Sequence, residues 1–218
     1  MTANGETLRT TIAGLRSIAG YIADLIAALE QVLPDYAPPP ALTPYSQRDP
    51  LWRDYEYAHN YIPPATLGRY GCYITCVAML ASLAGYDDTP PQVAAKLTAA
   101  RAFTGSQLDH PERVTAAYPR LKWIESVNWR AKPADLARLS RELTAGPVIL
   151  EVEFKPGGAT PPTDQHFVLA QGLTPDGCDL HIIDPWDGAS TNLLERYALD
   201  NWNLARAIYG ARIFKVGE

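Results

Sequence analysis

Five prolines within eleven residues constrain the architecture of this chain more than any other feature. They lie in the stretch "PDYAPPPALTP", residues 34–44. Proline lacks a backbone N–H and fixes φ, so a helix cannot continue through such a stretch, which favours an extended, semi-rigid spacer. We therefore predict three parts: an N-terminal helical segment over 1–36, a proline-rich linker over 37–44, and a folded domain over 45–218.

The segment before the prolines has the pattern of one long amphipathic helix over residues 7–33. Apolar residues recur there in alternating steps of four and three, as in a coiled coil. The residues of this heptad seam are Leu8, Ile12, Leu15, Ala19, Ile22, Ile26, Leu29 and Leu33. Ile18, Leu25 and Val32 widen the apolar face on one side. Two interpretations remain open: the helix docks onto its own domain, or it self-associates as a small helical bundle and makes the chain a homo-oligomer.

After the linker, helix patterns come first and strand patterns follow, which is typical of an α+β fold with an antiparallel sheet. The predicted helices cover residues 72–84, 90–100, 111–119 and 132–143. The predicted strands cover residues 121–127, 146–154, 164–173, 178–185 and 205–216, the last being one strand or two. Residues 155–165 are predicted to form a loop in front of His166.

Composition and charge exclude several classes of protein. Hydrophobic residues make up 47% of the 218 residues, enough for a core, and the net charge of −5 without a basic stripe argues against nucleic acid as a partner. No apolar run reaches the length of roughly 18 residues that a membrane span needs. The start "MTANGETLRT" lacks the features of a signal peptide, so we expect a protein that is cytoplasmic as synthesised. Three cysteines and four histidines without zinc-ligand spacing predict neither a disulfide framework nor a metal or cofactor.

A hairpin is predicted where "TPDG" joins two strands. With Pro175 and Asp176 in a type I turn and Gly177 in the left-handed region, Thr174 would pair with Cys178 and Val168 with Asp184. Side chains on one face of a strand repeat every two residues, and diagonal cross-strand neighbours lie within reach of each other. This register predicts that His166 and Asp184 meet, and that a slip by one residue would separate them.

Cys72 follows a glycine and opens a helix in "RYGCYITCVAMLASLAG", residues 69–85. The positive end of a helix and its free N–H groups favour a thiolate, so Cys72 is a candidate nucleophile. The alternative is an inert cysteine buried in the core, which is common. We expect Cys76, one turn further along, to be buried, and Cys178 has no evident role.

Four sequence elements, in order, resemble the papain-like cysteine peptidases related to the peptidases that process double-glycine leaders of bacteriocins. They are "PYSQRDPLW", "YGCYITCVAMLASLAG", "DQHFVLAQGL" and "HIIDPWDG", between Pro44 and Gly188. The resemblance covers the chain from Tyr45 to its C-terminus but not the N-terminal helix. It implies a papain-like fold and a thiol-dependent hydrolase of bacterial or phage origin.

The resemblance also implies the site residues. Cys72 would be the nucleophile, His166 the general base and acid, Asp184 the residue that orients His166, and Gln47 a donor of the oxyanion hole. Without the resemblance, Gln47 could be a solvated loop residue, and Asp184 could be a turn former before Pro185. Many relatives have glycine-proline after the cysteine, where this chain has Tyr73 and Ile74, and this difference bears on the substrate.

Three functions are compatible with these residues. The first is a cysteine peptidase that acts on a peptide or protein, and the second is a peptidoglycan peptide hydrolase of a phage or prophage, virion-associated or released at lysis. The third is a non-catalytic, oligomeric binding module on a papain-like scaffold. Aromatic residues of the domain could wall a substrate groove or belong to the core: Trp52, Tyr55, Tyr57, Tyr61, Trp123, Trp129, Trp186 and Trp202.

Overall fold

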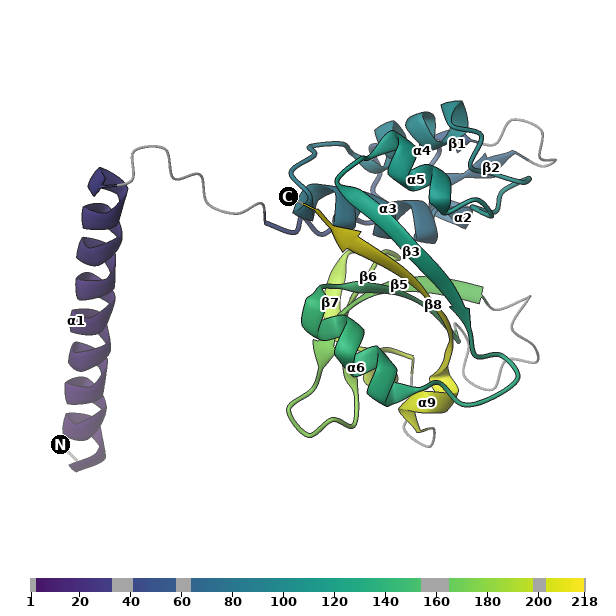
Figure 1. Ribbon diagram of the computed structural model, residues 1–218. Coiled ribbons are helices and arrows are strands. Elements are labelled where there is room, and N and C mark those ends of the chain that lie inside the picture. The colour runs from purple at the N-terminus through teal and green to yellow at the C-terminus, as the bar shows by residue number, and fades with distance from the viewer. Residues whose placement is uncertain (1–2, 33–40, 58–63, 154–164, 198–202, 218) are drawn as a thin grey trace. The chain divides into compact units, whose positions relative to one another are not determined.

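The computed structural model describes residues 3–32, 41–57, 64–153, 165–197 and 203–217 (Figure 1). Contacts divide the chain into two compact units, Met1–Pro39 and Pro40–Glu218. Of the loop predicted over residues 155–165, only Gln165 lies among the described residues. Among the residues that the structure describes, no helix combines the length and the apolar content needed to cross a bilayer.

The described residues of the first unit form one long helix, α1, Ala3–Val32. It begins four residues earlier than the sequence predicts, and Leu33 lies outside the described residues. Large apolar side chains of the predicted heptad seam are exposed on it, for example Leu8, Leu15 and Ile22.

The second unit combines helices with an antiparallel sheet, as predicted, and the sheet has six strands. The longer helices are α3 Cys72–Leu83, α4 Pro90–Ala99, α5 Glu112–Ala117 and α6 Leu136–Ala145. The strands of the sheet are β3 Leu121–Asn128, β4 Val148–Glu153, β5 Gln165–Leu173, β6 Leu180–Asp184, β7 Ala189–Asn192 and β8 Ile208–Val216. Their order across the sheet is β3-β8-β4-β5-β6-β7, and each neighbouring pair is antiparallel.

The two faces of this sheet bury two separate hydrophobic cores. Ile149 and Leu169 face the core that α3, α4 and α5 cover, whereas Leu150 and Val168 face the core that α6 covers. Neighbouring residues of a strand point to opposite faces, so strands buried on both faces read as continuous apolar runs such as "FVLA", residues 167–170 of β5. Figure 1 shows α3, α4 and α5 together on one side of the sheet and α6 on the other.

Several short elements escaped the sequence analysis. They are β1 Glu56–Tyr57, β2 Ala65–Thr66, α2 Leu67–Tyr70, β7, α8 Leu193–Arg196 and α9 Leu204–Ala207. Elements of two to four residues contain about one helical turn or one to two strand alternations, which is too few repeats for a periodic pattern to reveal them. The C-terminal pattern over 205–216 resolves into the end of α9 and the single strand β8.

The hairpin between β5 and β6 confirms the predicted register at one end and corrects it at the other. Gly177 has φ 71° and donates to the Thr174 carbonyl at 2.8 Å, as expected for the predicted turn. Thr174, however, donates to the Asp179 carbonyl, so its predicted pairing with Cys178 is wrong by one residue. A register shift between Ala170 and Gly172 compensates for this residue.

Beyond the shift, Leu169 pairs with Ile183, which places Val168 opposite Asp184 as predicted. The extra residue in the turn shifts the strand pairing by one residue, and the bulge in β5 shifts it back. A β-bulge adds one residue to one strand and restores the alternation of faces after it. His166 and Asp184 therefore share a face in spite of the longer turn.

Candidate active site

Cys72 is the first residue of α3 and lies half-buried in a cleft. The first N–H groups of a helix have no partner within the helix, and the helix dipole places partial positive charge there. The predicted position of Cys72 at a helix start is therefore the observed one. Cys76 lies one turn further along and is fully buried, also as expected.

Gly71 separates the short helix α2 from α3 and fits only because it lacks a side chain. A Cβ at this position would lie 2.5 Å from the carbonyl oxygen of Leu67 and 2.8 Å from its Cα. The backbone N–H of Gly71 donates to the same carbonyl at 2.8 Å. This close approach of backbone to backbone sets the direction in which α3, and with it Cys72, leaves α2.

The imidazole of His166 is hydrogen-bonded to the carboxylate of Asp184. Nε2 of His166 lies 2.9 Å from Oδ1 of Asp184, and both side chains are buried. The contact predicted from the hairpin register is thus present. Because Nε2 is hydrogen-bonded to Asp184, the other ring nitrogen, Nδ1, is the one left to face Cys72.

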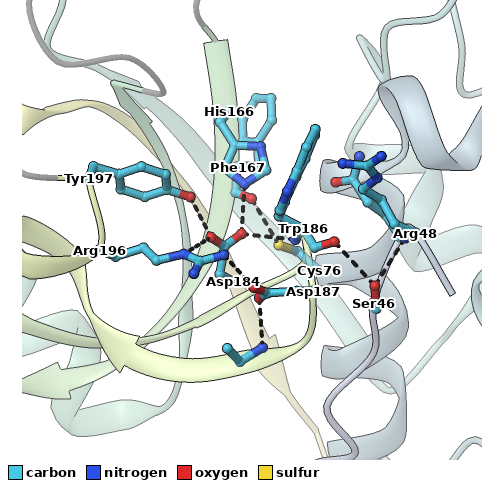
Figure 2. Close-up of polar contacts among 12 residues, drawn as sticks. Ser46, Arg48, Cys76, His166, Phe167, Asp184, Trp186, Asp187, Arg196 and Tyr197 are labelled. Carbon is cyan, nitrogen blue, oxygen red and sulfur yellow. Dashed lines mark hydrogen bonds and ion pairs between the residues drawn. The ribbon is translucent and has the colours of Figure 1, made fainter.

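Asp184 receives further hydrogen bonds that fix its carboxylate (Figure 2). The backbone N–H of Trp186 donates to Oδ1 at 2.9 Å. Nε of Arg196 donates to Oδ2 at 2.9 Å, and the Tyr197 hydroxyl donates to the same oxygen at 2.7 Å. Burial alone would raise the pKa of Asp184, but the hydrogen bonds and charge around it, His166 foremost, hold that pKa well below its usual value. The carboxylate is therefore ionised throughout the neutral range.

The pKa of His166 reflects both of its partners. Burial would lower it, but hydrogen bonds with Asp184 and with Cys72, together with the charges of these two residues, raise it to about 9. An imidazole with a buried carboxylate on one side and a sulfur on the other favours its protonated form. The site therefore holds an imidazolium beside the cysteine at neutral pH.

Trp186 covers the histidine on the side of the loop that carries Arg48. Its ring lies edge-on to the His166 ring, with centroids 6.5 Å apart. On its other side, the guanidinium of Arg48 lies 4.4 Å from the centre of the Trp186 ring, and Figure 2 shows the ring between the two residues. An apolar ring next to a buried ion pair excludes water and strengthens the electrostatic interaction.

Gln47 lies next to the end of β6, about 140 residues away in sequence. Its backbone N–H donates to the carbonyl of Pro185 at 2.6 Å, and the hydroxyl of Ser46 donates to the carbonyl of Trp186 at 3.2 Å. Nε2 of Gln47 donates to the carbonyl of Gly68 at 3.2 Å. Gln47 is buried and lines the same cleft as Cys72, so it is not a solvated loop residue.

A second contact joins α3 to β5 beside the reactive groups. Tyr73 follows Cys72, Phe167 follows His166, and these two aromatic rings stack with centroids 4.6 Å apart. The thiol of Cys76 lies 3.7 Å from the carbonyl oxygen of Phe167. The stack fixes the backbone on both sides of the gap between the cysteine and the histidine.

The cleft has a volume of about 310 Å³ and is lined by residues from α2, α3 and β5 and from three loops. Of the aromatic residues considered above, Tyr61 and Trp202 lie outside the described residues, and among the other six only Trp186 lines the cleft. Tyr57 and Trp129 are buried in the two cores instead. Tyr70, Tyr73 and Phe167 also contribute aromatic rings to the cleft.

Sequence reasoning missed Arg196 and Tyr197, which hold the second oxygen of Asp184. They lie at the end of α8, a helix of four residues that has no periodic signal of its own. Nothing in their spacing from Asp184 distinguishes them from other polar residues. Within the described parts of the chain, no group of three or more potential metal ligands gathers in one place.

A cysteine at the start of a helix that packs on an antiparallel sheet, with a histidine of that sheet beside it, defines the papain-like class of cysteine peptidase domains. The chain belongs to the Peptidase_C39 like family, whose model matches residues 42–209. Membership of this family indicates a peptidase and confirms the fold and the resemblance predicted from the sequence. No curated protein matches the chain at a significant level.

Proposed function

We propose that this protein hydrolyses peptide bonds with Cys72 as nucleophile, His166 as general acid and base, and Asp184 as the residue that orients His166. One observation carries the proposal: His166 lies between Asp184, at 2.9 Å from Nε2, and the thiol of Cys72. A nucleophile, a base and an orienting carboxylate in one chain of hydrogen bonds are the recurring arrangement of covalent acyl-transfer catalysis.

The first half of the reaction forms an acyl-enzyme. The Cys72 thiolate attacks the carbonyl carbon, a C–S bond forms, and the carbonyl oxygen takes up the negative charge. The imidazolium of His166 then donates its proton to the leaving nitrogen, and the C–N bond breaks. With a pKa of about 9, His166 keeps that proton at neutral pH until it is transferred to the leaving nitrogen.

The second half releases the acid. The neutral imidazole of His166 accepts a proton from a water molecule, which attacks the thioester carbon. The C–S bond breaks, a carboxylic acid leaves, and the thiolate and imidazolium are restored. Asp184 keeps its negative charge throughout and holds the ring in one tautomer.

Gln47 and the backbone N–H of Cys72 form the proposed oxyanion hole. An amide nitrogen carries two hydrogens, and the contact of Nε2 with the Gly68 carbonyl uses one of them. The second hydrogen is available in the cleft that Gln47 shares with Cys72. Fixed donors at the place where charge develops stabilise the transition state without reorganisation.

The test is hydrolysis of a pooled library of quenched fluorescent peptides, with cleavage sites read by mass spectrometry. We expect cleavage by the natural chain and by Cys178→Ala, because Cys178 is exposed at the β5–β6 turn. Cys72→Ala should abolish it. Cleavage that survives Cys72→Ala, or a library that remains intact with the natural chain, would contradict the proposal.

A further inference from the structure

The apolar face of α1 needs a partner. Eight large hydrophobic side chains on this helix each expose 40% or more of their surface. They are Leu8, Ile12, Leu15, Ile18, Tyr21, Ile22, Leu25 and Ile26. A contiguous apolar surface of this kind marks an interaction site on a soluble protein.

The heptad positions of these residues identify the kind of partner. Leu8, Leu15 and Ile22 occupy position d, Ile12, Ala19 and Ile26 occupy a, and Ile18 and Leu25 occupy g. The opposite row, position f, is polar from Thr10 through Ser17 and Asp24 to Gln31. Gly14 and Gly20 lie at c and b, off the seam, and a Cβ there would meet nothing within 4 Å. A sustained heptad repeat is the pattern of a helix that packs against other helices of the same kind.

The width of the face sets the number of helices. In a two-stranded coiled coil the buried seam consists of a and d alone, whereas a face of a, d and g is wider than one neighbouring helix covers. With Ile18 and Leu25 at g, a dimer would leave two branched apolar side chains largely exposed. A bundle of three or more helices buries them.

The charges of α1 argue against a lipid surface as the partner. Helices that lie on membranes carry rows of Lys and Arg on their polar face. The polar residues of α1 include only Arg9 and Arg16 as bases, against Glu6, Asp24 and Glu30 as acids. Anionic lipids would gain little from such a helix.

We propose that α1 assembles the chain into a homo-oligomer of three or more copies, as a helical bundle through positions a, d and g. The proposal is independent of the proposed catalytic function, because it rests on the first unit alone.

The first experiment measures the mass of the full chain in solution by light scattering coupled to size exclusion. We expect at least three times the 23.9 kDa of one chain. A mass of one chain would overturn the proposal and favour docking of α1 on its own domain, or on vesicles of anionic lipid if the chain sediments with them. A mass of two chains would also overturn it.

Two matched variants then locate the interface. Leu15→Glu with Ile22→Glu places two carboxylates on the d row, and Thr10→Glu with Ser17→Glu places two on the f row. Glutamate has good helix propensity, so both pairs leave the intrinsic helix preference similar. We expect the d-row variant to be a monomer and the f-row variant to keep the mass of the natural chain. Equal masses for the two variants would overturn the proposal.

A third variant tests the width of the face. Ile18→Gln with Leu25→Gln removes the apolar g row and leaves the a and d rows intact. We expect the mass to fall to that of two chains. An unchanged mass would overturn the assigned role of the g row in setting the number of helices.

Discussion

At the scale of single residues, the central feature is a carboxylate that is saturated with donors. Oδ1 of Asp184 accepts from His166 and from the backbone of Trp186, and Oδ2 accepts from Arg196 and Tyr197. A buried charge is costly unless it is fully hydrogen-bonded, and these four contacts offset that cost. The carboxylate is thereby held in one orientation, and so is the imidazole bound to it.

The pH dependence of catalysis follows from the pKa of His166. Its hydrogen bond and charge interaction with Asp184 help to raise that pKa to about 9, so the imidazolium is present below pH 9 and is lost above it. For the natural chain we expect kcat/KM to fall with increasing pH around 9. In Asp184→Asn the pKa of His166 drops, and this alkaline limb should move to lower pH.

The same variant should lower kcat/KM by roughly 10²-fold or more, since general acid–base catalysis contributes a factor of about that size. Asp54→Asn, which affects an exposed ion pair with Arg53, is the matched control. An alkaline limb at the same pH in Asp184→Asn and in the natural chain would refute the assigned role of Asp184.

Gln47 provides a second residue-scale prediction. If its amide stabilises the oxyanion, Gln47→Ala should reduce kcat about 10²- to 10³-fold with a small change in KM. Gln171→Ala, an exposed position in the bulge of β5, serves as the control and should keep full activity. A change of KM alone in Gln47→Ala would mean that the amide binds substrate and not the developing charge.

At the scale of elements, the site depends on how α3 is aimed at the end of β5. Gly71 sets this direction through its contact with Leu67, and the stack of Tyr73 on Phe167 holds the two elements together. Misplacing a reacting group by about 1 Å can cost roughly 10²-fold in rate. Changes at these positions should therefore affect catalysis without touching the reactive groups.

Gly71→Ala should lower both activity and stability. The added Cβ would lie 2.5 Å from a backbone oxygen, which cannot rotate away as a side chain can, so the start of α3 must shift. We expect kcat/KM to fall about 10²-fold and the midpoint of thermal unfolding to decrease. Gly172→Ala, where nothing lies within 4 Å of the added Cβ, should change neither. Equal effects of the two substitutions would contradict this account.

Two substitutions at Tyr73 separate the contribution of its ring to stability from that of its hydroxyl. The hydroxyl is buried and has no hydrogen-bond partner among the described residues. Tyr73→Phe keeps the stack and removes an unsatisfied group, so the free energy of unfolding in urea should rise by about 1 kcal/mol. Tyr73→Ala removes the stack and should lower it by about 3 kcal/mol or more. If Tyr73→Phe lost activity, the hydroxyl would have a role in the cleft that the stack does not explain.

At the scale of the whole molecule, the sequence predicted the α+β fold and the contact between His166 and Asp184 because both depend on strong local patterns. Long apolar strands and a "TPDG" turn fix the register of a hairpin to within one residue. The predicted pairing at the turn was wrong by one residue, and the bulge in β5 brings the pairing beyond it back to the predicted register. Arg196 and Tyr197 could not be predicted in this way. Their meeting with Asp184 depends on the path of the chain through β7 and α8, and no spacing in the sequence records it.

The proximity of Gln47 to the end of β6 also lies beyond local patterns. It depends on a backbone hydrogen bond to Pro185 across about 140 residues, which only the resemblance to a family could suggest. Conversely, the aromatic residues considered for a substrate groove lie mostly in or against the cores, because large apolar rings stabilise the fold most when they are buried. Composition alone cannot separate a ring in a core from a ring in a cleft.

The three cysteines of the full chain allow the most direct test of the central claim, that Cys72 is the nucleophile and that His166 activates it. Iodoacetamide reacts with thiolates, and an ordinary cysteine, with a pKa near 8.5, is largely protonated at pH 6. Cys178 is more exposed than Cys72, while burial raises the pKa of Cys76 well above its usual value. Alkylation at pH 6, followed residue by residue with mass spectrometry, should modify Cys72 first, and His166→Ala should abolish this preference. Faster modification of Cys178, or a preference for Cys72 that survives without His166, would contradict the account.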